Sequence, residues 1–213
     1  MASESTTPTE LEVCIGFSTL ECARFVMERH PEIARVQLRA YNYRPDTHDQ
    51  TEPLLPVDRD IFMTQSIADE FASRYGENWN VVLDSLVKLQ NGTSAHFLMM
   101  DLHPPKFDGI TDFIREQMQR TVIPRFGGGF LLETNRSYQF FGTGIIPQDM
   151  YREYLAWFQL ADKVTSIHPS LPRQHTMVAD HRYIAYSHLR GTTGLRLTTR
   201  ADKAVEPRVV AIV

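Results

Sequence analysis

Residues 129–142, GFLLETNRSYQFFG, place an apolar run, five polar residues and an aromatic run within the length of one hairpin. The polar residues 133–137 therefore predict a turn between two strands. Two interpretations of this turn are open. It is either a plain solvent-facing loop or a phosphate-handling edge of an active site.

The composition is typical of a globular protein, since 42% of the 213 residues are hydrophobic and 23% are charged. We expect a disordered tail over residues 1–10 and a single α+β domain over residues 11–213. No apolar stretch approaches the roughly 20 residues that span a bilayer, and the N-terminus does not have the pattern of a secretion signal. These features predict a cytoplasmic protein that does not enter a membrane.

Charge is distributed unevenly along the chain. Residues 1–119 contain 10 Lys and Arg against 19 Asp and Glu, whereas residues 120–213 contain 12 against 7. Most of the positive charge in the second part is arginine, whose planar fork suits phosphate. This excess is compatible with a nucleotide or nucleic-acid partner, and equally with an ordinary solvated surface.

Hydrophobic periodicity predicts strands and helices in alternation before residue 94. Ser18 or Thr19 is expected to cap the first helix. Residues 44–60 contain three prolines and little periodicity, which predicts a long loop. The expected elements are a strand over 11–17, a helix over 20–33, a strand over 34–41, and helices over 64–74 and 79–90.

The apolar run from Phe97 to Met100 predicts a buried central strand that ends at Asp101. Together, these elements predict the α+β class, with a mainly antiparallel sheet and flanking helices. The remaining expected elements are an amphipathic helix that begins near 107 and ends before Pro124, the hairpin over 129–142, a helix over 148–164 with Met150, Tyr154, Trp157 and Phe158 inward, a strand that ends at Asp180, a further element over 183–189, and a strand over 195–199.

Three apolar segments are each associated with a pair of polar residues two positions apart in the sequence. The pairs are Asp101 with His103, Ser137 with Gln139, and Asp180 with Arg182. Residues two apart in a strand share one face of a sheet, so each pair is expected to point in one direction. A divalent metal that works with a triphosphate needs two or three oxygen-rich ligands, with basic or hydroxyl groups for the phosphates.

The order of these motifs resembles the catalytic core of the archaeo-eukaryotic primase superfamily, the primase-polymerases. FLMMDLH (97–103) resembles the family's hydrophobic-Asp-x-Asp motif, with His103 at the second acidic position. ETNRSYQFFG (133–142) resembles its Ser-x-His hairpin, with Gln139 in place of the histidine. TMVADHRYIAYSHLRGTTGLR (176–196) resembles its third motif, hydrophobic-Asp, with arginines downstream.

This resemblance covers roughly residues 95–200 and implies a primase-polymerase-like core that handles nucleoside triphosphates on a nucleic-acid template. It implies Mg²⁺ or Mn²⁺ as the cofactor, and the imidazole favours Mn²⁺. The resemblance is also compatible with a partner subunit. The implied catalytic and metal-binding residues are Asp101, His103 and Asp180, and the implied phosphate-binding residues are Arg136, Ser137, Gln139, Arg182 and Arg190.

Alternatives remain open at this point. A degenerate primase-like module would bind nucleic acid or a partner protein without catalysis, and an unrelated α+β domain would do neither. Asp101 could simply cap a turn, and Asp180 could form an ordinary ion pair. The chain lacks a GxSxG elbow, a GxGxxG loop after a strand and a CxxC pair, so serine hydrolase, dinucleotide-binding and zinc-ribbon functions are excluded.

Overall fold

A computed structural model of the protein describes residues 8–42, 50–51, 54–64, 66–75, 79–104, 107–161, 178–199 and 205–213. The strands in these residues form one nine-stranded sheet, in which every strand pair is antiparallel. The predicted α+β class, a mainly antiparallel sheet with flanking helices, is confirmed. None of the described helices is both long and apolar enough to cross a membrane.

The main path of the sheet is β2-β1-β4-β5-β7-β6-β9, with β3 paired to β1 and β8 paired to β4. The strands are β1 (Ile33–Asn42), β2 (Gln50–Thr51), β3 (Leu55–Asp58), β4 (Asn80–Leu89), β5 (Ser94–Leu102), β6 (Gly129–Glu133), β7 (Tyr138–Pro147), β8 (Gly194–Arg196) and β9 (Arg208–Ile212). The helices are α1 (Pro8–Glu12), α2 (Thr19–Arg29), α3 (Arg59–Thr64), α4 (Ile67–Ser73), α5 (Ile110–Arg120), α6 (Ile123–Phe126), the 3₁₀ helix η1 (Gln148–Met150), α7 (Tyr151–Ala161) and α8 (His181–Arg190).

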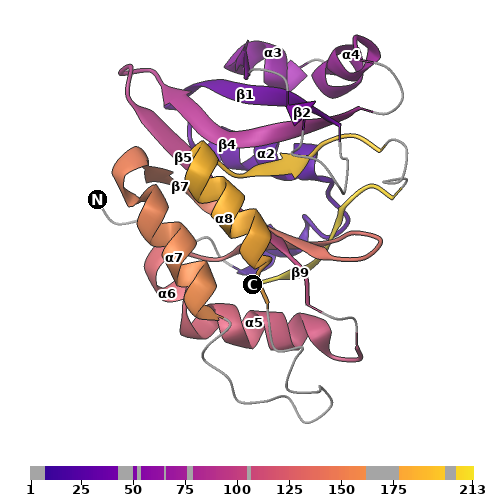
Figure 1. Ribbon diagram of the computed structural model, residues 1–213, viewed down its shortest axis with the longest axis vertical. Helices are drawn as coiled ribbons and strands as arrows, with labels where there is room; N and C mark the ends of the chain where they lie inside the picture. The colour runs from indigo at the N-terminus through magenta and orange to yellow at the C-terminus, as the bar shows by residue number, and fades with distance from the viewer. Residues whose placement is uncertain are drawn as a thin grey trace.

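The sheet has a hydrophobic core on each face. Helix α2 packs against one face, and α5, α6, α7 and α8 lie on the other (Figure 1). Side chains along β5 point alternately into the two cores. Phe97 and Met99 belong to the first core, and Leu98 and Met100 belong to the second. The continuous apolar run in the sequence is therefore that of a strand buried on both faces, as predicted.

The hairpin predicted over 129–142 is formed by β6 and β7. Phe130 lies opposite Phe141, and Glu133 lies opposite Tyr138. The turn is closed from within, because the Ser137 N–H donates to Thr134 Oγ1 at 3.0 Å and the Thr134 N–H donates to the Ser137 carbonyl oxygen at 2.9 Å. These polar residues therefore stabilise a tight connection between two buried strands.

The helix predicted over 79–90 is wrong, since this segment forms the central strand β4. Val81, Leu83 and Val87 fit a strand's period of two, while Leu83, Leu86 and Val87 share one side of a helix, so the short pattern is ambiguous. Pairing with β1 runs from Asn80 to Leu89, and most side chains on both faces are buried. Tertiary pairing here overrides the local helical pattern.

The N-terminal segment also differs from its prediction. The expected strand over 11–17 is wrong, because α1 ends at Glu12 and a turn leads into α2. α1 begins at Pro8, inside the expected disordered tail, and residues 1–7 lie outside the described residues. The predicted cap is confirmed: Ser18 and Glu21 form a reciprocal capping box at the start of α2.

Two further segments depart in part from their predictions. The expected loop over 44–60 contains β2, β3 and the start of α3, although residues 43–49, 52 and 53 lie outside the described residues. The helix expected over 148–164 is present as α7, but Met150 precedes it and is exposed rather than packed inward. Residues 162–164 are not among those described.

A buried polar network joins the centre of the sheet to the segment after α8. The Arg39 guanidinium forms an ion pair with Asp84 and also donates to Thr192 Oγ1 at 3.1 Å. Thr192 Oγ1 in turn donates to Asp84 Oδ2 at 2.9 Å. Because Asp84 is fully buried and Arg39 nearly so, each charge depends on the other for compensation.

A second part of this network runs through His96. Ser85 Oγ accepts from the Thr193 N–H at 3.0 Å, which leaves its own hydrogen to donate to His96 Nδ1 at 2.9 Å. His96 Nε2 then donates to Gln148 Oε1 at 2.9 Å. The neutral ring satisfies all of these contacts, and burial lowers the pKa of His96 to about 4.

We expect Asp84→Ala to reduce the free energy of unfolding by about 3–5 kcal/mol, because it leaves the Arg39 guanidinium buried without a counter-charge. Denaturant unfolding would measure this loss. The double variant Arg39→Met, Asp84→Ala should be less destabilised than Asp84→Ala alone. A single variant within about 1 kcal/mol of the wild type would show that the pair does not have this role.

We expect stability to fall as the pH is lowered from about 6.5 to about 4, because the unfolded chain protonates His96 in this window and the folded protein does not. The contribution is about 3 kcal/mol across the full window. Chemical unfolding at several pH values, compared with His96→Gln, isolates this group. An identical pH profile in the variant would contradict the prediction.

Candidate functional site

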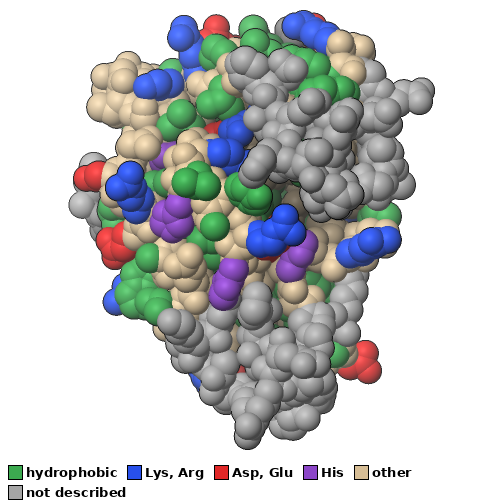
Figure 2. Space-filling model, viewed as in Figure 1, with side chains coloured by type: hydrophobic (Ala, Val, Ile, Leu, Met, Phe, Trp, Pro, Cys, Tyr) green, Lys and Arg blue, Asp and Glu red, His purple; other side chains and the backbone are tan. Residues whose placement is uncertain are grey.

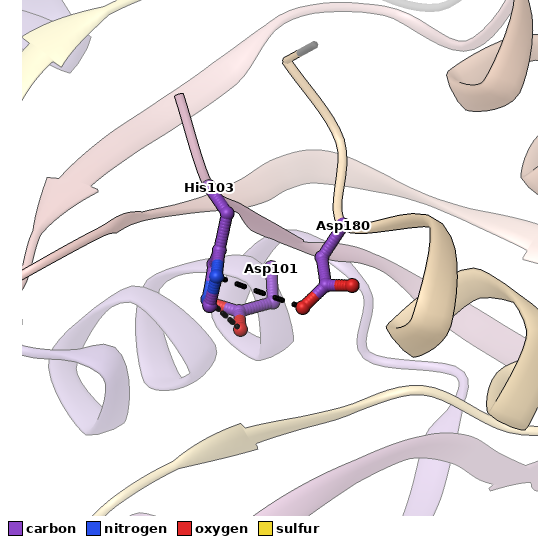
Figure 3. A group of neighbouring side chains, drawn as sticks. All are labelled: Asp101, His103 and Asp180. Atoms are coloured by element: carbon purple, nitrogen blue, oxygen red, sulfur yellow. Dashed lines mark hydrogen bonds and ion pairs between the residues drawn. The ribbon is translucent and has the colours of Figure 1, made fainter. Parts of the chain in front are cut away.

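Asp101, His103 and Asp180 lie together where the interior strand β5 ends and α8 begins (Figure 3). His103 Nε2 is 3.0 Å from Asp101 Oδ2, and His103 Nδ1 is 3.6 Å from Asp180 Oδ2. The structure thus brings together all three residues that the sequence predicted as catalytic and metal-binding. The imidazole lies between the two carboxylates.

The backbone fixes this arrangement by joining the end of β5 to the segment before α8. Leu102 forms an antiparallel bridge with Ala179, and both side chains are buried. The His103 N–H donates to the Val178 carbonyl oxygen at 3.1 Å, and the Asp180 N–H donates to the Asp101 carbonyl oxygen at 3.4 Å. The apolar residues anchor the two segments in the core, so the polar residues beside them face outward together.

Asp180 is the N-cap residue of α8. Its Oδ1 accepts from the backbone N–H groups of Arg182 at 2.9 Å and Tyr183 at 3.1 Å. The predicted strand face shared by Asp180 and Arg182 is therefore wrong, because Arg182 lies in the first turn of a helix. Capping occupies one carboxylate oxygen and leaves Oδ2 directed at His103.

The cluster is accessible to solvent and suits a divalent cation. The side chains of Asp101 and Asp180 are 22% and 25% exposed, and that of His103 is 52% exposed. One ligand atom from each residue lies within 4.8 Å of the others. Around an octahedral cation with ligand bonds of about 2.1 Å, neighbouring donors are about 3.0 Å apart and opposite donors about 4.2 Å apart, so these side chains must close on a shared ion. Two carboxylates with one imidazole favour Mn²⁺ over Mg²⁺.

Gln139 lies beside this cluster on β7. It is the cross-strand partner of Asp101, so the two side chains share one face of the sheet. Its side chain is buried, and Oε1 has no hydrogen-bond partner among the described residues. A buried amide oxygen without a partner is costly, so a hydrogen-bonding ligand at this position would be favoured.

The other predicted phosphate-binding residues lie at the hairpin turn and on α8, outside the cluster itself. Ser137 Oγ is 2.8 Å from Thr134 Oγ1, so it takes part in the hairpin turn, and Arg136 is exposed at the tip of that turn. Arg182 and Arg190 are exposed near opposite ends of α8. Arg182 adjoins the cluster directly, whereas Arg190 lies about 12 Å along the helix.

Tyr183 was not predicted as part of this region. Its hydroxyl donates to the Gly194 carbonyl oxygen and accepts from the Gly194 N–H, both at 2.7 Å. Burial, together with the nearby charge of Asp101, raises the pKa of Tyr183 well above its usual value. The contact of Tyr183 with Gly194 depends on the position of β8 in the fold. The sequence does not reveal it, because a tyrosine three residues after a helix cap is a common pattern.

Comparison with protein families gives one match. Residues 62–208, more than half of the chain, match the family described as AEP-like: Archaeo-eukaryotic primase 1D-like. The matched range includes every residue of the site described above. Comparisons with curated proteins and with solved structures gave no match.

The cap and ligand roles of Asp180 can be separated. We expect Asp180→Ala to lower the free energy of unfolding by about 1 kcal/mol, because the N–H groups of Arg182 and Tyr183 lose their acceptor. Asp180→Ser should retain most of that stability, since serine caps nearly as well, but it removes the carboxylate. Denaturant unfolding would test this, and equal losses for the two variants would contradict the capping role.

Proposed function

This chain belongs to the archaeo-eukaryotic primase 1D-like family, and from that premise we propose that it is a metal-dependent nucleotidyltransferase of the primase-polymerase type. It would use nucleoside triphosphates on a nucleic-acid template. The observation that carries the proposal is the convergence of Asp101, His103 and Asp180, from a strand end and a helix start, into one exposed cluster.

In this proposal Asp101 and Asp180 supply carboxylate ligands to Mg²⁺ or Mn²⁺, and His103 supplies a nitrogen ligand. The cation would activate the attacking 3′ hydroxyl and neutralise charge on the triphosphate. The bridge between Leu102 and Ala179 keeps the ligands together before substrate arrives. Such preorganisation lowers the cost of assembling the site.

The surrounding residues have supporting roles in the proposal. Gln139 lies opposite Asp101, where its amide nitrogen donates to a phosphate oxygen of the bound triphosphate, while its Oε1 accepts from a hydroxyl or water of the bound nucleotide. Arg182 contacts phosphate from the first turn of α8, where the helix dipole also favours negative charge. Arg136 and Ser137 at the hairpin tip, and Arg190 at the far end of α8, are the outer phosphate contacts.

A second candidate function is a primase-like module that binds nucleic acid or a partner protein without catalysis. It is favoured by His103 and Gln139, which replace an acid and a histidine of the family motifs. The double variant His103→Asp, Gln139→His distinguishes the two candidates. If it gains activity that the wild type lacks, the native protein is the binding module.

The first experiment is binding of a labelled nucleoside triphosphate to the full chain with Mn²⁺, with Mg²⁺ and with neither. We expect metal-dependent binding that is tighter with Mn²⁺ and is lost in Asp101→Asn and in Asp180→Ser, followed by templated primer extension. Asp112→Asn is the matched control, because Asp112 is an exposed carboxylate on α5. Binding that is unchanged in both site variants would contradict the proposal.

A further inference from the structure

The outward face of α8 carries an unusual set of exposed side chains. Arg182, Tyr186 and Leu189 follow one another at spacings of four and three, so they lie on one side of the helix. Tyr186 is 36% exposed and Leu189 is 84% exposed. An aromatic ring and a large aliphatic side chain thus stand beside an arginine on an open surface.

The charge of this face has one sign. Helix α8 contains Arg182 and Arg190 together with His181 and His188, all exposed, and none of its residues is acidic. Figure 2 shows Lys, Arg and His side chains gathered over the middle of this side of the molecule, where Figure 1 places α8. Carboxylates flank the helix at its two ends: Asp180 and Asp101 at the start, and Asp149 in the cavity beside His188.

Both ends of this face lead into features already defined. At its N-terminal end, Asp180 belongs to the proposed metal cluster. At its C-terminal end, the helix borders a cavity of about 350 Å³ lined by Gln148, Asp149, Tyr151, Arg152, His188 and Gly191. Arg152 therefore extends the line of cationic side chains beyond the helix, over a track of at least 15 Å.

We propose that the outward face of α8 binds an unpaired nucleic-acid strand and guides it to the Asp101–His103–Asp180 cluster. A base stacks on the Tyr186 ring, Leu189 packs against the neighbouring sugar or base, and Arg190 contacts a phosphate of the strand, while Arg182 contacts the triphosphate at the cluster. This inference rests on the proposed function and adds to it the surface that holds the template.

The chemistry of the face favours an unpaired strand over duplex. Arginines alone would serve either form, because duplex and single strands both present phosphates. An exposed aromatic ring contributes only where a base is free to stack, and such stacking is worth about 1–3 kcal/mol per base. The combination on one helix matches the mixture of stacking and cationic contacts typical of single-strand binding.

The test is fluorescence anisotropy of labelled single-stranded DNA and RNA of about 20 nucleotides, longer than one such surface covers. The full-length protein is titrated without metal or nucleotide, at several salt concentrations. Tyr186→Ala should weaken binding by roughly 5- to 150-fold, as loss of one stacked base predicts. Tyr186→Phe, which keeps the ring, should bind as the wild type does.

Arg190 is tested by its effect on salt dependence. Arg190→Gln should reduce the slope of log affinity against log salt by about 0.7, as expected for one phosphate contact on a single strand. Arg74→Gln is the matched control, since Arg74 is also exposed but follows α4, which packs into the other core from α8. It should leave affinity and slope unchanged.

Wild-type affinity in Tyr186→Ala, or equal weakening of single-stranded and duplex binding, would overturn the proposal. So would an α8 face that binds a protein and no nucleic acid. These outcomes are independent of the proposed function, because triphosphate binding by the metal cluster is measured separately and does not need Tyr186. Loss of strand binding in Tyr186→Ala, with metal-dependent triphosphate binding intact, supports the assignment to α8.

Discussion

The buried ion pair between Arg39 and Asp84 constrains the rest of the molecule. It joins β1 to β4 within the sheet and, through Thr192, fixes the segment that leaves α8. Neither charge can be solvated where it lies, so the pair tolerates only one position for that segment. The adjacent contacts of Ser85 and His96 with Thr193 and Gln148 extend the same constraint to β5 and η1.

Helix α8 is consequently held at both ends. The polar network fixes its C-terminal end, and the bridge between Leu102 and Ala179 fixes its N-terminal end. Asp180 is therefore placed by contacts that lie outside the metal cluster. Asp101 depends in the same way on the register of β5, because a slip of one residue would turn its carboxylate toward the opposite face. The geometry of the site follows from the packing around it.

Local pattern predicted the parts of the fold in which neighbours along the chain decide the structure. The Ser18 cap, the hairpin over 129–142 and the buried strand before Asp101 are such cases, and they explain why Asp101 and His103 were paired correctly. β4 could not be predicted this way, since its apolar residues fit one side of a helix as well as a strand until β1 is known to lie beside them. The sequence predicts Asp180 on a strand because its role as a cap depends on α8. The apolar residues of this segment do not indicate where that helix begins. The buried position of Gln139 depends on the pairing of β7 with β5, which places it opposite Asp101.

The first and last parts of the described chain are joined. Ser18 bridges Arg208, the Gly16 N–H donates to the Val209 carbonyl oxygen at 2.9 Å, and the Val209 N–H donates to the Phe17 carbonyl oxygen at 2.9 Å. β9 also covers the edge of β6. During synthesis on the ribosome, Asp101 and His103 emerge well before Asp180, and β9 emerges later still. Until β9 has been made, the β6 edge is open to pairing with other chains. Until Asp180 has been made, the set of cation ligands is incomplete.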